Sequence, residues 1–280
     1  KKIYSAFSWE SLGYFYGRIT SLCGFTPERH EGKILGLSAH GDPKKAKALI
    51  DKMVGIKDGK ICTFPGSYYR PFFSNYSEEL KQEASKFSRE DLAAAAQTKL
   101  ETIVCEIVSN HVKKTGLRNI CLAGGVFTNV RLNQKIRELP GVEDVFIYPN
   151  MGDDGVCAGA VYHKLLNEEG ICSSPIKSLY LGPNLSNDTM LAELTKKGFK
   201  IERPEHIYAN VTKLLSEEQV IALVRGRAEF GPRALGNRSI LLTPDSRRLS
   251  ESLNNRLGRN DFMPFAPIIA SNLAGRCLKG

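Results

Sequence analysis

RNICLAGGVFTN at residues 118–129 opens the stretch that decides the fold, and it continues with VRLNQKIREL (130–139), DVFIYP (144–149) and NMGDDGVCAGA (150–160). Ile120–Ala123 and Val145–Tyr148 are short apolar runs, which is typical of buried strands. Between them the pattern predicts a helix that Pro140-Gly141 stops, and another helix follows the second run. This order predicts a parallel α/β sheet, in which ligands bind beyond the carboxyl ends of the strands.

A glycine-rich turn and an acidic turn follow the two predicted strands. Gly124 and Gly125 would let backbone N–H groups approach a phosphate without interference from a Cβ atom. Asp153 and Asp154 could hold a divalent cation or orient a water. In the alternative interpretation, the glycine pair is only a tight turn and the aspartates are an N-cap and a first-turn acid. Short glycine motifs do not decide between the two.

The composition is that of an ordinary globular protein, with 280 residues, 42% of them hydrophobic and 25% charged. No apolar run approaches the roughly 20 residues of a membrane span, and the N-terminus does not resemble a signal peptide. The seven cysteines show no CxxC spacing. We therefore expect a cytoplasmic protein with reduced thiols, of which Cys105, Cys121 and Cys157 would lie in the core.

The positive charge is concentrated in the last third of the chain. The formal net charge is +9, and residues 174–280 hold 16 Lys and Arg against 10 Asp and Glu. Between Arg225 and Arg259 there are eight arginines and no lysine. Arginine grips carboxylate or phosphate in a fixed fork, so a small anionic substrate is favoured over a solvated basic face. A nucleic-acid surface would more often mix lysine, arginine and aromatic residues.

Before residue 118, apolar periodicity and glycines outline further elements. The predictions are a helix over Trp9–Gly24, a tight loop near a site over Glu31–Gly41, a short helix over Lys44–Val54, a loop or hairpin over Gly59–Asn75, and a long helix over Ser88–Gly116. Ser88 should cap the long helix, with Asp91 at its third position. Glu31 and Lys33 could form an exposed ion pair or contact a ligand.

Glu168–Pro175 is predicted to be a linker to a second unit. There we expect helices over Thr189–Lys197, Asn210–Ser216 and Arg248–Leu257, and strands over Val220–Val224 and Ser239–Leu242. The segment 226–240 contains three glycines, one proline and three arginines. It predicts an irregular loop that could cradle an anion.

Several blocks together resemble the carbamoyltransferase family that includes nodulation and aminoglycoside O-carbamoyltransferases. They are EGKILGLSAHG (31–41), AGGVFTN (123–129), RLNQKI (131–136), GDDGVCAGA (152–160), YLGP (180–183), EFGPRALGNRSIL (229–241) and MPFAPII (263–269). These blocks follow the family's order over almost the whole chain, so their joint specificity is high.

The resemblance implies an α/β fold in two modules. Residues 1–170 would be the C-terminal half of an actin/Hsp70-type nucleotide-binding fold, similar to the tRNA threonylcarbamoyladenosine ligase subunit. Residues 176–280 would be an incomplete YrdC-like domain. In the family, the second module makes carbamoyl-adenylate from carbamoyl phosphate and ATP, and the first transfers the carbamoyl group to a substrate hydroxyl with a bound divalent metal (Fe²⁺, Mg²⁺ or Mn²⁺).

The resemblance also implies roles for individual residues. Arg233 and Arg238 would bind phosphates and serve catalysis in the second module, with Asn237 and Arg259 as weaker candidates for carbamoyl phosphate. Asp153 matches the metal-binding aspartate and would be catalytic. The expected nucleotide-binding residues are Lys33, Gly36, Gly124, Gly125, Val126, Asn129 and Asp154.

The sequence departs from the family in places. Family members carry an upstream HxxxH segment with two metal ligands, and none of His30, His40, His111, His163 or His206 forms such a pair. Met263 stands where an arginine is common. The resemblance therefore implies a partial chain that continues in relatives on both sides and is inactive alone.

Two other functional classes remain open: an actin-type ATPase or kinase, and a non-catalytic nucleotide-binding fragment. The acceptor is not readable beyond a small molecule with a hydroxyl group. We expect no membrane partner and no nucleic acid, and leave a homodimer open.

Overall fold

The computed structural model describes residues 2–71, 76–171, 175–258 and 265–278. The chain divides into two compact units, Lys1–Ser173 and Ser174–Gly280, and the division falls inside the predicted linker. The α/β class is confirmed, while the actin/Hsp70-type and YrdC-like identities and the domain assignments stay predictions. Among the described helices, none combines the length and apolar character that crossing a lipid bilayer requires.

Helix α5 (Arg89–Thr115) confirms the long helix predicted over Ser88–Gly116, and it is the centre of the first unit. The Ser88 hydroxyl accepts the backbone N–H of Asp91 at 3.1 Å, which caps the first turn. Gly116 ends the helix in a left-handed conformation with φ of 70°, which glycine adopts without strain. Residues 92–97 of α5 are all buried. Because consecutive helical side chains point in different directions, this part of α5 must be covered on all sides.

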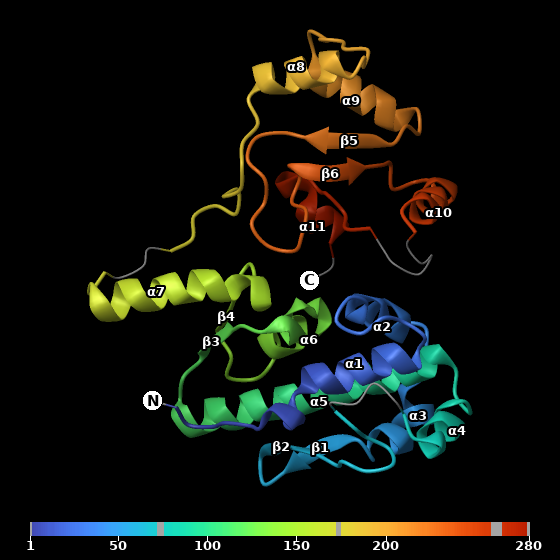
Figure 1. Ribbon diagram of the computed structural model, residues 1–280, viewed down its shortest axis with the longest axis vertical. Coiled ribbons are helices and arrows are strands. Elements are labelled where there is room, and N and C mark those ends of the chain that lie inside the picture. The colour runs from blue at the N-terminus through green and yellow to red at the C-terminus, as the bar shows by residue number, and fades with distance from the viewer. Residues whose placement is uncertain (1, 72–75, 172–174, 259–264, 279–280) are drawn as a thin grey trace. The chain divides into compact units, whose positions relative to one another are not determined.

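Other helices supply that cover (Figure 1). They are α1 (Leu12–Leu22), α2 (Glu31–Ser38), α3 (Pro43–Ile50) and α6 (Val130–Arg137), and each packs against α5. The apolar face predicted for α1 is buried at Leu12, Phe15, Tyr16 and Ile19. The short helix α4 (Glu78–Ala84) precedes α5.

The prediction of a tight loop over 31–41 is wrong, because Glu31–Ser38 is helix α2. Burial of Ile34 and Leu37 in the core compensates for the two helical glycines, each of which disfavours a helix by about 1 kcal/mol. Gly41 has a packing role, since a Cβ atom there would lie 2.0 Å from the backbone oxygen of Glu90. The predicted Glu31–Lys33 ion pair is absent from the described contacts; the Lys33 ammonium lies 5.2 Å from the centre of the Phe25 ring.

The hairpin lies slightly earlier in the chain than predicted. Strands β1 (Val54–Lys57) and β2 (Lys60–Thr63) pair antiparallel across Asp58 and Gly59. Both turn residues have positive φ, 52° and 69°, as the two-residue turn that matches strand twist requires.

The parallel pair is formed by β3 (Asn119–Leu122) and β4 (Asp144–Ile147), with α6 as the crossover helix. The helix predicted to start at the glycine pair is instead a 3₁₀ turn η2 (Gly125–Thr128) followed by α6. Asn129 separates them because its ψ of 96° is extended and its side chain caps α6. The 3₁₀ turn η3 (Asp153–Gly155) and helix α7 (Val156–Glu168) follow β4. Cys121 and Cys157 are exposed, so their prediction as core thiols is wrong.

In the second unit, β5 (Ile221–Val224) and β6 (Arg238–Leu241) pair antiparallel. The three predicted helices are confirmed with small shifts at their ends, and two short elements follow near the C-terminus. The bounds are α8 (Asn187–Lys196), α9 (Ile207–Ser216), α10 (Arg247–Arg256), η4 (Ser271–Leu273) and α11 (Ala274–Cys277).

Candidate functional site

The glycine turn between β3 and α6 has an open side. Gly124 has φ of 113° and ψ of 149°, a conformation that only glycine adopts readily. Cβ atoms built at Gly124 and Gly125 would meet nothing within 4 Å. Both residues are exposed, so a ligand could approach this backbone from solvent.

The two predicted turns are joined by one backbone bond. The N–H of Gly124 donates to the carbonyl oxygen of Met151 at 2.6 Å. Parallel pairing of β3 and β4 brings both turns to the same sheet end. The Gly124 amide is therefore engaged within the protein, and the amides of Phe127 and Asn129 donate to the carbonyl oxygens of Gly124 and Val126. Any phosphate would have to use the amides of Gly125 and Val126.

The acidic turn does not hold a metal ion with its own residues. Asp153 and Asp154 are both exposed, and no side chain caps α7, whose N-cap is Gly155. The interpretation of Asp154 as a helix cap is therefore wrong. Among the described residues, no group of three or more His, Cys, Asp or Glu side chains could hold a metal ion. Asp153 alone is too few ligands for a stable divalent site, so the donor set present does not fit one.

The side chain of Asn129 faces inward rather than toward a ligand. It is buried, and its Oδ1 atom accepts the N–H of Leu132 at 3.0 Å. Both of its polar atoms also bond to Gln97 of α5, a residue that the sequence reasoning missed. Val126 lies near the start of α1, where a Cβ atom on Gly13 would be 3.7 Å from its Cγ2 atom. Lys33 and Gly36 both lie on α2.

In the second unit, two arginines of the predicted anion loop donate hydrogen bonds to backbone carbonyl oxygens of the protein. The Arg238 guanidinium donates to the carbonyl oxygens of Arg225 at 2.8 Å, Asn237 at 2.9 Å and Gly226 at 3.2 Å. The Arg227 guanidinium donates to two carbonyl oxygens of the YLGP block, at 3.0 and 2.8 Å. These side chains hold backbone segments together, which limits their freedom to grip a phosphate.

The backbone amides of the same loop are occupied by Glu229. Its Oε1 atom accepts the N–H groups of Leu235 at 2.8 Å, Asn237 at 2.7 Å and Arg238 at 3.1 Å. Partial desolvation acts to raise the pKa of this carboxyl, but these amides and the residue's own N–H outweigh it and hold the pKa at about 2. If this loop cradles an anion, as its sequence predicts, it must therefore use groups other than these three amides.

A hollow of about 320 Å³ lies beside this loop, on the side of Tyr180. Arg225 lines it, and among the described residues no side-chain partner is found for its guanidinium. The Tyr180 hydroxyl donates to the carbonyl oxygen of Leu235 at 3.0 Å, which fixes the ring at the rim. Asn237 also lines the hollow, whereas Arg233 does not. Arg259 and Met263 lie outside the described residues.

The sequence reasoning gave Arg225 no role because it precedes the glycine-rich loop. The available signal was its position at the carboxyl end of the predicted strand Val220–Val224.

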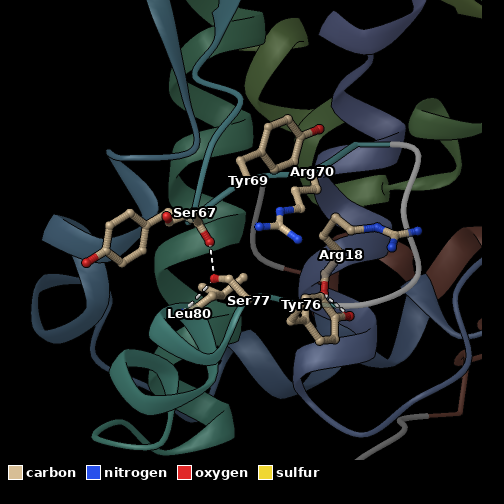
Figure 2. Close-up of a pocket in the computed structure, with 8 residues that line it drawn as sticks. Arg18, Ser67, Tyr69, Arg70, Tyr76, Ser77 and Leu80 are labelled. Carbon is tan, nitrogen blue, oxygen red and sulfur yellow. Dashed lines mark hydrogen bonds between the residues drawn. The ribbon is translucent and has the colours of Figure 1, made fainter.

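The aromatic segment after β2 is a packing region, shown in Figure 2. Tyr69 is 1% exposed, and a neighbouring cavity of about 10 Å³ is lined by residues that include Arg18, Tyr76 and Ser77. The Tyr76 hydroxyl donates to the Arg18 carbonyl oxygen at 3.2 Å, and Ser77 donates to Ser67. Such a space holds about one water molecule, so it is no substrate site.

The amino-acid sequence matches two protein-family models, one within each unit. The carbamoyltransferase N-terminus model matches residues 1–162, and the carbamoyltransferase C-terminus model matches residues 212–280.

Curated relatives match over nearly the whole chain. Nodulation protein NolNO of Sinorhizobium fredii is 31% identical over 93% of this chain, and nodulation protein NolO of Bradyrhizobium diazoefficiens is 31% identical over 92%. The protein MJ1051 of Methanocaldococcus jannaschii is 35% identical over 93%. The chain spans 39%, 48% and 51% of the lengths of these three relatives, respectively. With a family model on each unit and these relatives, the chain belongs to the carbamoyltransferase family.

Proposed function

We propose that this chain is part of an enzyme that transfers a carbamoyl group to a hydroxyl of a small acceptor, using carbamoyl phosphate and ATP. The observation that carries the proposal is the match of both carbamoyltransferase models, one to each unit. The nodulation relatives support an oxygen acceptor by analogy alone.

The proposed reaction has two steps. First, carbamoyl phosphate, ATP and one water give carbamoyl-adenylate, pyrophosphate and inorganic phosphate. Then the acceptor hydroxyl attacks the carbamoyl carbon, its C–O bond forms, AMP leaves and the hydroxyl proton passes to solvent or a base. We assign the first step to the second unit and the transfer to the first.

For the first step we propose that arginines neutralise the phosphates in and beside the hollow. Arg225 is the best placed, because this residue lines the hollow and no described side chain pairs with its guanidinium. Arg233 and Arg259 remain candidates for carbamoyl phosphate. Arg238 and Asn237 would act mainly by holding the loop, since their side chains donate to its carbonyl oxygens. Preorganised donors of this kind lower barriers where charge develops.

For the transfer step we propose that the backbone amides of Gly125 and Val126 bind the adenylate phosphate, because those of Phe127 and Asn129 donate to carbonyl oxygens within the turn. Lys33, Gly36 and Asp154 are proposed nucleotide contacts on the weaker ground of the family's motifs. A divalent metal would supply Lewis acidity in the complete enzyme. Asp153 could give it one carboxylate, but its other ligands would have to come from outside the described residues, and we derive no step through it.

The test is ATP–pyrophosphate exchange by the full-length protein that contains this chain. We expect exchange only when carbamoyl phosphate is present, and carbamoylation of a hydroxyl acceptor when one is added. Nucleotide hydrolysis without any need for carbamoyl phosphate would point instead to an actin-type ATPase. Absence of exchange and hydrolysis, in a protein that binds ATP, would leave a non-catalytic binding role.

A further inference from the structure

Gln97 forms a fully satisfied polar centre inside the first unit. It lies on α5 and is only 5% exposed. Its Oε1 atom accepts the Tyr16 hydroxyl at 2.7 Å and the Asn129 Nδ2 atom at 2.8 Å. Its Nε2 atom donates to Glu101 Oε1 at 2.7 Å and to Asn129 Oδ1 at 3.2 Å. All four hydrogen-bonding sites of the amide are thus used, which leaves it one orientation.

The partner of Gln97 stands at the end of the glycine turn. Asn129 is 7% exposed, and its Oδ1 atom also caps α6 through the Leu132 N–H. The opposite end of the turn is held by the bond from Gly124 to Met151. Helices α1 and α6 both pack against α5 (Figure 1), and side chains from α1, from α5 and from the residue that caps α6 meet at Gln97. The turn is therefore fixed at both ends, and Gln97 fixes one of them from a different helix.

We propose that Gln97 is a positioning residue, which sets the conformation of residues 124–129 so that the open backbone can receive the phosphate of a nucleotide. The claim that the turn binds a nucleotide rests on the proposed function, whereas the claim that Gln97 fixes the conformation of the turn does not. Gln97 itself is buried and touches no ligand. Preorganisation of the turn would raise nucleotide affinity because the ordering is complete before binding.

The isosteric change Gln97→Glu removes both donors while keeping shape and acceptors. The Oδ1 atom of Asn129 then loses a partner, and a second carboxyl lies beside Glu101. A buried polar group that loses its hydrogen-bond partner destabilises the structure more than an exposed group does, because water cannot replace the partner. We expect the turn to loosen and the affinity for AMP, the adenylate that leaves in the transfer step, to fall by roughly tenfold or more.

Protonation of the introduced carboxyl should partly restore the network, because it returns one O–H donor. Charged or titratable groups near this point come from every neighbouring helix. They are Tyr16 and Cys23 on α1, Glu31 on α2, Glu101 on α5 and Arg131 on α6, whose guanidinium lies 3.8 Å from Glu101. The ratio of variant to wild-type affinity, with both proteins measured at the same pH, should therefore rise as pH falls from 8 to 5.

Gln134 provides a matched control. It lies on the exposed side of α6, and its Nε2 atom donates to Glu138 Oε1, four residues on, at 2.7 Å. Gln97 makes the same bond to Glu101 with the same spacing and length. Gln134→Glu thus makes the same chemical change without touching the glycine turn.

The experiment combines hydrogen exchange of the peptide covering residues 124–129 with AMP affinity measured by calorimetry. We expect faster exchange and weaker, pH-dependent binding for Gln97→Glu, and wild-type values for Gln134→Glu. If Gln97→Glu does not fold, Tyr16→Phe removes one bond from the same amide and should show a smaller change in the same direction. Unchanged exchange in a folded variant overturns the inference. Faster exchange in the variant, when the wild type does not bind AMP, keeps the positioning role and refutes the proposed binding of adenylate at this turn instead.

Discussion

The Glu229 carboxylate accepts hydrogen bonds from backbone amides of its own loop, and this determines which neighbouring groups can still bind an anion. With its carboxylate bonded to three backbone N–H groups, the loop keeps one shape without a ligand. Arg238 and Arg227 tie the same loop to adjacent strands and turns. Among the residues that the structure describes, Arg225 is the one that lines the hollow and can still bind an anion there.

This arrangement predicts how stability depends on pH. The pKa of Glu229 falls from an ordinary value of 4.5 to about 2 in the folded protein. A lowered pKa means that the ionised group stabilises the fold above pH 4.5, and that this contribution is lost as pH falls through about 2. We therefore expect Glu229→Gln to lower the thermal midpoint at neutral pH, and the difference from wild type to vanish near pH 2.

Thermal unfolding followed by circular dichroism from pH 2 to 7 checks this. Glu193→Gln, on exposed helix α8, is the control for loss of one charge. A Glu229→Gln difference that stays constant over the whole pH range would show that the charge is unimportant.

Among the elements, the glycine that precedes α7 and a glycine inside this helix are in opposite situations. A Cβ atom at Gly155 would lie 2.0 Å from the carbonyl oxygen of Asn150, whereas one at Gly159 would meet nothing within 4 Å. We expect Gly155→Ala to destabilise the protein by about 1–3 kcal/mol because the turn after β4 must shift. Gly159→Ala should stabilise it by about 0.5–1 kcal/mol, since alanine is the better helix former.

Urea unfolding of the two variants side by side measures both effects. Equal midpoints for Gly155→Ala and wild type would mean that the turn accommodates the methyl group.

Elements with clear periodicity and end signals could be predicted from the sequence. Helix α5 is found by its Ser88 cap and closing Gly116, and β3 and β4 by their apolar runs. Helix α2 was missed because its glycines suggest a loop, and only its packing on α5 makes it helical.

The site was predictable as a set of turns but not as a set of contacts. The backbone position of the glycine turn follows from β3, whereas the bond between Gln97 and Asn129 joins residues 32 apart. The inward direction of Glu229 has no sequence signal either, because spacing does not determine where a loop side chain points.

For the whole molecule, we propose that the second unit forms carbamoyl-adenylate and the first transfers the carbamoyl group. A substitution in one unit should therefore impair one reaction and spare the other. Arg225→Ala should reduce carbamoyl phosphate-dependent ATP–pyrophosphate exchange by roughly tenfold or more, the effect of losing a charged hydrogen bond. Transfer from supplied carbamoyl-adenylate should persist. Gly125→Val should do the reverse, sparing exchange and impairing transfer, because a branched side chain would obstruct the backbone that we propose binds the adenylate phosphate.

Both reactions are measured on the same preparations of the full-length protein. Arg203→Ala removes an exposed arginine outside the hollow and is the matched control. Loss of both reactions in either variant, with normal folding, would contradict the assignment of one step to each unit.

The Glu229 carboxylate also has a consequence for the solution around the protein. A group tethered to its own binding partners competes with dissolved anions at an effective concentration that is on the order of millimolar or higher for short connections. Sulfate, chloride and free phosphate from buffers are thus poorly placed to displace it from the amides of residues 235, 237 and 238. The conformation of the loop should therefore depend little on the salts in solution. A ligand that binds elsewhere in the hollow does not have to compete with the Glu229 carboxylate.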